Sequence, residues 1–170
     1  TKHVAAGLAA MECVIVHDLF LNETSNYAHV FLPGSTFLEK DGTFTNAERR
    51  INRVRKVMSP KNGYADWEIT QLLANAMGGG WKYNHPSEIM EEIALTTPSF
   101  AGVSYQTLER LGSIQWPCNQ ANPSGTPTMH VDGFVRGKGR FMVTEYIATD
   151  EKTGPRFPLL LTTGRILSQY

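Results

Sequence analysis

Apolar and polar positions along the first third of the chain predict helices and strands in turn. From Val4 to Met11, apolar side chains recur at spacings of four and three, which predicts an amphipathic helix over residues 2–11. An uninterrupted apolar run follows at 13–16, and a second one at 30–32 ends in Pro-Gly. Runs that are apolar on both faces are typical of parallel strands covered on both sides. We therefore expect these two runs to be neighbouring parallel strands.

The middle of the chain is predicted to be mainly helical. Segment 39–46 is polar with a central glycine and predicts a loop. Segment 47–57 allows a helix, because its apolar residues recur at a spacing of three. The other predicted helices are a short one capped at 22–25, a strong one over 66–77, one that begins at Pro86, and one over 105–111 closed by Gly112.

The last third is predicted to contain turns and strands. Residues 119–127 are rich in Asn, Pro, Ser and Gly and are the best linker candidate. Glycines among β-branched residues predict turns and strands over 134–147, and 159–162 predicts a buried strand. Alternating helices and strands with short connections indicate an α/β fold with a doubly wound parallel sheet. Both ends interrupt a pattern, so we expect a fragment of a longer protein.

Composition narrows the function classes. Apolar residues make up 41% of the 170 positions and charged residues 19%, which favours a packed globular chain. The net charge is zero, so no basic surface for nucleic acid is expected. No apolar run approaches the roughly 20 residues that span a membrane. Cys13 is expected to be a buried small hydrophobe and Cys118 to be structural, and their separation predicts neither a disulfide nor a metal site.

Candidate binding residues follow the predicted strands. Asp18 lies beyond the first strand, at the edge where parallel sheets bind ligands, and its carboxylate suits a guanine edge or a ribose diol. Spacing alone leaves open whether Asp18 instead caps the next turn. Lys40, close to Gly42, could bind a phosphate or could belong to a solvated loop. The pair Arg49–Arg50 could likewise bind a phosphate or cover the surface with its alkyl stems. The run 163–165, Thr-Gly-Arg, offers turn amides and a planar cation to an oxyanion.

Several motifs in one order resemble the molybdopterin oxidoreductase family. They are VIVHDLFLNETSNYAHVFLPGSTFLEKDGTFTNAERR, ADWEITQLLANAMG and PLLLTTGRILSQY. The middle segments YNHPSEIMEEI and LGSIQWPC resemble formate dehydrogenase catalytic subunits in particular. The chain departs from the family at His17, where Gln or Ser is frequent, and at His29, where Asp is usual.

The resemblance implies a Rossmann-like parallel-sheet unit with added helices at 1–118, then a linker and β-rich connection at 119–154. The first strand and turn of the C-terminal β-barrel follow at 155–170. It also implies a bis-molybdopterin guanine dinucleotide site with molybdenum or tungsten. The implied contacts are His17, Asp18, Lys40, Asp66, Thr163, Gly164, Arg165, Ile166, Leu167, Ser168, Gln169 and Tyr170. Asp18 or Asp66 would suit the guanine, and Lys40 and Arg165 would suit phosphates or the pterin.

For the longer protein, the resemblance implies oxidation of formate to carbon dioxide. The metal ligand and the iron–sulfur motifs of the family have no match here, so we expect these 170 residues alone to be inactive. The expected partners are electron-transfer subunits with iron–sulfur or flavin centres, in a cytoplasmic, NAD-linked complex without a membrane span. Nitrate reductase, a respiratory NADH dehydrogenase subunit, and a non-catalytic structural relative remain alternatives.

Overall fold

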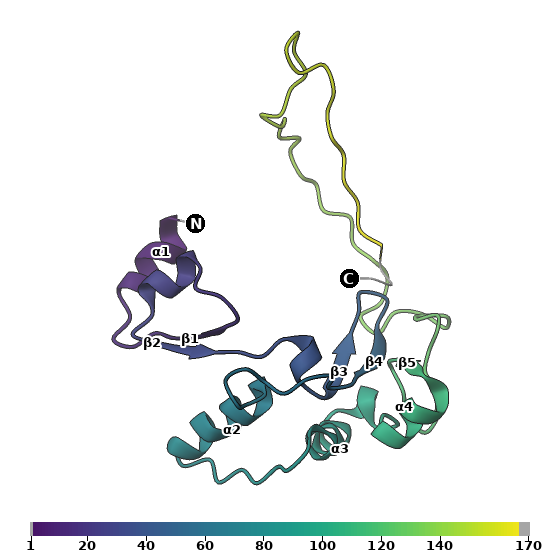
Figure 1. The fold of residues 1–170 in the computed structure, drawn as a ribbon. Coiled ribbons are helices and arrows are strands. Elements are labelled where there is room, and N and C mark those ends of the chain that lie inside the picture. Colours follow the sequence, from purple (N-terminus) through teal and green to yellow (C-terminus); the bar gives the residue numbers. More distant parts are fainter. Residues whose placement is uncertain (1, 167–170) are drawn as a thin grey trace.

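The computed structural model describes residues 2–166, which form a curved arrangement of two small sheets and four α-helices (Figure 1). The α/β class predicted from the sequence is confirmed. The elements are α1 (Lys2–Ala9), β1 (Ile15–Asp18), η1 (Glu23–Tyr27), β2 (Val30–Pro33), η2 (Phe37–Glu39), β3 (Gly42–Thr45), β4 (Arg50–Val54), α2 (Asp66–Ala76), α3 (Pro86–Thr96), η3 (Pro98–Phe100), α4 (Tyr105–Leu111) and β5 (Ser113–Gln115).

The first sheet is the predicted parallel pair, but its first strand lies at Ile15–Asp18 rather than at 13–16, so Asp18 ends the strand instead of lying beyond it. β1 and β2 run side by side in a register that opposes Ile15 to Val30 and Asp18 to Pro33, with η1 in the crossover. The expected cover on both faces is not present within residues 2–166, where Ile15 and Val30 are each 45% exposed. The prediction that Cys13 is buried was wrong, because Cys13 lies in the exposed connection before β1.

The second sheet is antiparallel, in the order β3-β4-β5, and the sequence did not predict it. β3 replaces the expected loop and β4 replaces the possible helix. Arg49, in a left-handed conformation with φ 67°, and the Asn46 side chain, which accepts from the Arg50 amide at 2.9 Å, close the hairpin. Ile51 of β4 is fully buried and Arg53 lies over the Tyr105 ring at 3.7 Å, so one face of the strand covers α4.

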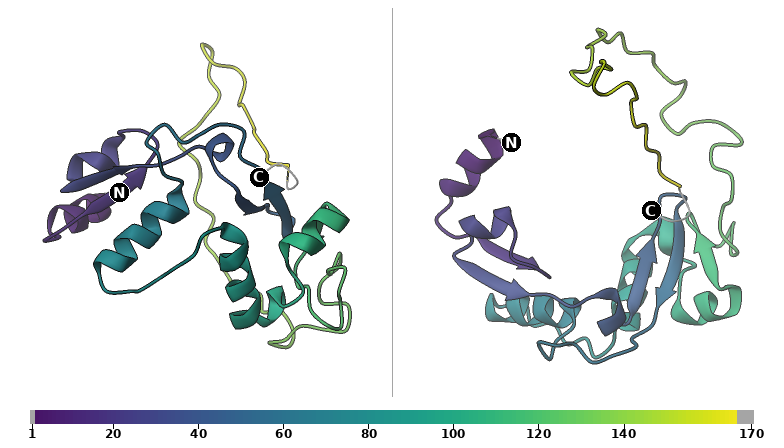
Figure 2. Two further views of the ribbon diagram at one scale, coloured as in Figure 1. Left: turned by 60° about the horizontal axis from the view of Figure 1, so that its bottom comes forward. Right: turned by 45° about the horizontal axis from the view of Figure 1, so that its top comes forward.

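The apolar core lies between the antiparallel sheet and the helices α3 and α4. Its buried members are Ile51, Met90, Val103, Leu108, Ile114 and Cys118. Burial raises the pKa of the Cys118 thiol, against a smaller opposite effect of the Gly125 amide, so this cysteine is structural, as expected. Figure 2 shows the parallel pair and the antiparallel sheet at opposite ends, with α2 and α3 between them.

The predicted helix ends are confirmed by their caps. His85 caps α3 through its side chain, with Pro86 as the first helical residue. Ser104 caps α4, and Gly112 takes the positive φ of 78° that a C-terminal glycine accommodates. The strong helix α2 likewise runs into Gly78, whose φ is 90°.

The structure beyond β5 differs from the prediction. The expected linker at 119–127 is hydrogen-bonded to the sheet, since the Thr126 amide donates to the Gln115 carbonyl at 2.8 Å. No strand forms over 134–147 or 159–162, and Leu161 is 91% exposed. A strand needs a neighbour to pair its backbone groups, and within residues 2–166 the paired strands are those of the two sheets, β1-β2 and β3-β4-β5. The three domain ranges proposed from the sequence stay predictions. Residues 2–166 include no helix that is long and apolar enough to cross a membrane.

Candidate functional site

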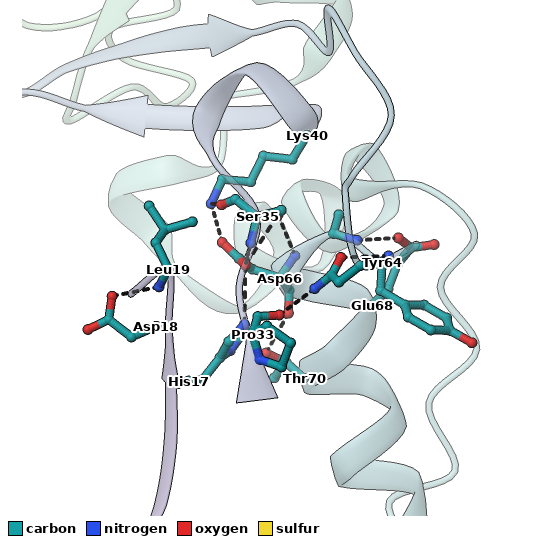
Figure 3. A network of polar contacts seen from close by, with 12 residues as sticks. His17, Asp18, Leu19, Pro33, Ser35, Lys40, Tyr64, Asp66, Glu68 and Thr70 are labelled. Atoms are coloured by element: carbon teal, nitrogen blue, oxygen red, sulfur yellow. Dashed lines mark hydrogen bonds and ion pairs between the residues drawn. The ribbon is translucent and has the colours of Figure 1, made fainter. Parts of the chain in front are cut away.

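A pocket of about 240 Å³ lies at the edge where both parallel strands end. It is lined by His17, Asp18, Leu19, Gly34, Ser35, Lys40 and Asp66 (Figure 3). Ligands of parallel α/β sheets bind at this edge, beyond the carboxyl ends of the strands. The structure therefore brings together four of the residues proposed from the sequence: His17, Asp18, Lys40 and Asp66.

Gly34 allows the walls of this pocket to approach each other closely. Its amide donates to the Asp18 carbonyl at 2.9 Å and so continues the pairing of the two strands. A Cβ atom at Gly34 would stand 3.1 Å from Oδ1 of Asp66 and 3.3 Å from Nε2 of His17. A side chain at this position would press on both groups, so glycine keeps the pocket open.

Asp66 is the hub of the hydrogen bonds in the pocket. It is the first residue of α2, and its Oδ1 accepts from the amide and the hydroxyl of Ser35, at 2.7 and 3.2 Å. Nε2 of His17 lies 3.2 Å from the same oxygen. Oδ2 accepts from Nζ of Lys40. Partial burial raises the pKa of Asp66, but the hydrogen bonds from Lys40 and the Ser35 amide outweigh it and hold that pKa below its ordinary value.

Lys40 is oriented by the backbone as well as by Asp66. Its ammonium group also donates to the Ser35 carbonyl at 3.1 Å, and its side chain is 19% exposed. The neighbouring Glu39 accepts from the amides of Thr36 and Lys61, each at 2.8 Å. These contacts fix the short helix η2 and aim Lys40 into the pocket rather than into solvent, as Figure 3 shows.

Asp18 lies at the margin of this group, and Figure 3 shows its carboxylate turned away from the Lys40–Asp66 pair. Its Oδ1 accepts from the Leu19 amide at 2.7 Å, and its Oδ2 accepts from the Asn22 side chain at 2.8 Å. Asp18 therefore does cap the following turn, one of the two roles left open by its spacing. A carboxylate has about four acceptor positions, so two remain for a ligand.

Three pocket residues were not singled out from the sequence: Leu19, Gly34 and Ser35. A signal for two of them was present, because Gly34 and Ser35 directly follow the second strand, whose parallel partner ends at Asp18. Parallel strands end at the same edge, so the residues after both strands converge there. Ser35 is 2% exposed, and its amide and hydroxyl hold Asp66 in place.

Of the C-terminal residues proposed from the sequence, the four that the structure describes do not line this pocket. Thr163, Gly164, Arg165 and Ile166 are exposed. Leu167, Ser168, Gln169 and Tyr170 lie outside the residues that the structure describes. Contacts from 163–170 to a cofactor stay a prediction.

Other candidates have structural roles. The Arg49 guanidinium donates to the carbonyls of Thr126 and Pro127, at 3.0 and 2.9 Å, and so ties the 119–127 segment to the hairpin. Arg50 binds Glu48 at 2.7 Å. The His29 side chain accepts from the Val14 amide at 3.0 Å, which gives this position a structural role. Among residues 2–166, no group of three or more His, Cys, Asp or Glu side chains is placed to hold a metal ion.

We predict a loss of stability in acid from the two carboxyls whose pKa values are lowered. The hydrogen bonds from Thr36 and Lys61 lower the pKa of Glu39, and those from Lys40 and Ser35 lower that of Asp66. A carboxyl with a lowered folded-state pKa stabilises the fold above its unfolded-state value, and this contribution is lost as pH falls through the folded-state value. Thermal unfolding temperatures should therefore fall from about pH 5 to about pH 3.

Glu39→Gln tests this prediction. Glutamine still accepts a hydrogen bond but does not titrate. The melting temperature of the variant should therefore fall less steeply than that of the unmodified protein over the same pH range. Glu151→Gln, at an exposed position, is the matched control. If the melting temperature of Glu39→Gln falls with pH as steeply as that of the control, Glu39 does not contribute to the loss of stability in acid.

Comparisons with known proteins relate the chain to one enzyme family. A family model described as molybdopterin oxidoreductase matches residues 1–76, which contain all seven lining residues. The chain is 43% identical to the F420-dependent formate dehydrogenase 2 subunit alpha of Methanococcus maripaludis, over 99% of the chain and 26% of the relative. It is 40% identical to the F420-dependent formate dehydrogenase subunit alpha of Methanocaldococcus jannaschii, over the same shares. The chain thus spans about a quarter of the length of these curated relatives.

Proposed function

The chain belongs to the molybdopterin oxidoreductase family, and we propose that it is part of the catalytic subunit of a formate dehydrogenase, where it binds one end of a bis-molybdopterin guanine dinucleotide. The relatives from Methanococcus maripaludis and Methanocaldococcus jannaschii are formate dehydrogenase alpha subunits, which supports formate as the substrate and carbon dioxide as the product. Their alignment covers nearly all of the chain, including the middle segments that resemble this enzyme.

The convergence of His17, Asp18, Lys40 and Asp66 on one pocket is the observation that carries the proposal. The pocket offers a cation, an imidazole and two carboxylates at the edge of a parallel sheet, and these groups fit the phosphates and the base of a nucleotide. Its volume of about 240 Å³ is smaller than the roughly 300–1,000 Å³ of a complete ligand site. We therefore assign it one part of the dinucleotide, and the remaining contacts belong to other segments of the protein.

The hydrogen bonds divide the two carboxylates between different roles. Oδ1 of Asp66 accepts twice from Ser35 and lies beside His17, and Oδ2 accepts from Lys40, so Asp66 positions Lys40 and His17. Asp18 is exposed and keeps acceptor positions free, which suits the two adjacent N–H donors of a guanine edge. Lys40 suits a phosphate oxygen, because a compact cation at a backbone-lined site is a common phosphate binder.

When bound, the cofactor would supply the oxidation of formate, and these residues would bind and orient it. We propose molybdenum or tungsten as its metal and an iron–sulfur cluster elsewhere in the protein. Electron-transfer subunits with iron–sulfur or flavin centres would take up the electrons. The NAD-linked acceptor and the cytoplasmic location expected from the sequence stay predictions, and the Methanococcus relative is named as F420-dependent.

Purification of the full-length protein tests this function. We expect molybdenum or tungsten and guanine nucleotide in a fixed ratio to protein, and reduction of an artificial dye that depends on formate. A nitrate reductase would instead oxidise a reduced dye with nitrate, and an NADH dehydrogenase subunit would show neither reaction by itself. Full-length protein that lacks both guanine nucleotide and formate-dependent reduction would refute the proposal.

A further inference from the structure

Asn22 connects the rim of the pocket to the short helix η1. Its side-chain oxygen accepts from the backbone amide of Ser25 at 3.2 Å, and the Ser25 hydroxyl accepts from the backbone amide of Asn22 at 3.0 Å. This reciprocal pair is a capping box, which fixes the side chain at the start of a helix. The side-chain nitrogen of Asn22 takes no part in this pair and donates to Oδ2 of Asp18, at 2.8 Å.

The Asp18 carboxylate is therefore held at both oxygens. The Leu19 amide binds Oδ1 at 2.7 Å, and Asn22 binds Oδ2. Asp18 is exposed, so without these donors its carboxylate would rotate among several conformers in water. Two donors, one on each oxygen, fix the plane of the carboxylate and the direction of its remaining acceptor positions.

We propose that Asn22 is a positioning residue that presents the Asp18 carboxylate to the guanine base, an inference that rests on the proposed function. A ligand that binds a preorganised side chain avoids the entropy cost of ordering it. Asn22 supplies this order from η1, which the capping box anchors, although Asn22 itself does not line the pocket.

Asn22→Ser in the full-length protein separates this role from capping. Serine caps a helix about as well as asparagine, but it lacks the side-chain amide that donates to Asp18. We expect guanine nucleotide, measured after hydrolysis of the released cofactor, to leave the purified variant about three to ten times faster, which corresponds to about 0.7–1.4 kcal/mol. The melting temperature should stay close to that of the unmodified protein.

Two further variants complete the experiment. Ser25→Ala removes the acceptor of the Asn22 backbone amide but keeps the Ser25 amide that holds the Asn22 side-chain oxygen, and it keeps the donor to Asp18, so the release rate should rise less than in Asn22→Ser. In a background that already carries Asp18→Asn, Asn22→Ser should add no further increase, because residues that act through one contact are not additive. A purely structural role would instead add its effect in that background.

The outcomes separate this inference from the proposed function. A release rate unchanged by Asn22→Ser, while Asp18→Asn raises it, would overturn the positioning role alone. Additive effects of the two substitutions would also overturn it. An Asp18→Asn variant that binds guanine nucleotide as tightly as the unmodified protein would instead remove the assignment of Asp18 to the base, and the role of Asn22 with it.

Discussion

Full-length protein that carries Asp18→Asn should contain much less molybdenum or tungsten than the unmodified protein, while each loaded molecule turns over formate at a near-normal rate. Asparagine replaces one acceptor oxygen with a donor, so one hydrogen bond to guanine is lost and a donor then faces a donor. A hydrogen bond to a charged group contributes about 1.5–3 kcal/mol, so cofactor affinity should fall roughly ten- to a hundredfold. Under the proposed assignment the base would lie far along the dinucleotide from the metal, so turnover per loaded molecule should be spared.

Metal analysis of matched preparations measures this effect. Asp132→Asn, at an exposed position outside the pocket, is the control and should load fully. If Asp18 only caps the turn, asparagine can still accept from the Leu19 amide, and metal content should barely change. Full loading of Asp18→Asn would end its guanine assignment and leave Asp66 as the next candidate.

Asp66→Ala should reduce both the stability of the fold and the retention of the cofactor. The substitution removes the acceptor of the Ser35 amide, and Ser35 is only 2% exposed. It also leaves Lys40 without its carboxylate. A buried amide without a partner costs about 1–3 kcal/mol, so we expect a loss of this size in the free energy of unfolding. The ion pair adds little, because the Asp66 side chain is 33% exposed to screening solvent.

Urea unfolding at neutral pH measures this loss, and Asp66→Asn is its matched control. Asparagine keeps an oxygen for the Ser35 amide, so the control should lose less stability than alanine. Both variants should release guanine nucleotide faster, because neither holds the Lys40 ammonium by charge. An Asp66→Ala protein as stable as Asp66→Asn would show that the Ser35 contact contributes nothing.

Local patterns were sufficient to predict the helices and the parallel pair. α2, α3 and α4 carry their periodicity and their end signals within one segment, and the structure confirms all three. The position of the pocket could be predicted from the same local patterns, because the carboxyl ends of two parallel strands lie at one edge of the sheet. Asp18 was found in this way and Lys40 from its glycine-containing loop, and the family resemblance added His17 and Asp66.

The antiparallel sheet could not be predicted from local pattern. Arg53 and Arg55 stand on either side of Val54, and arginine at such alternating positions does not look like the inner face of a strand. Both guanidinium groups bind Glu109 of α4, at 2.9 and 2.6 Å. This partner lies more than 50 positions along the chain, so no short window contains the reason for β4. The predicted strand at 159–162 failed for the converse reason, because its apolar pattern has no neighbouring strand to pair with.

The separation of the pocket from the apolar core has a consequence for local order. None of the six buried core residues comes from β1, β2 or α2, the elements that carry much of the pocket. Segments with few buried apolar contacts open at a lower free-energy cost than the rest of a fold. A ligand that bridges these elements would stabilise the closed arrangement in proportion to its concentration and affinity. Cofactor insertion would then protect the amides of the parallel pair from solvent exchange while those of the antiparallel sheet change little.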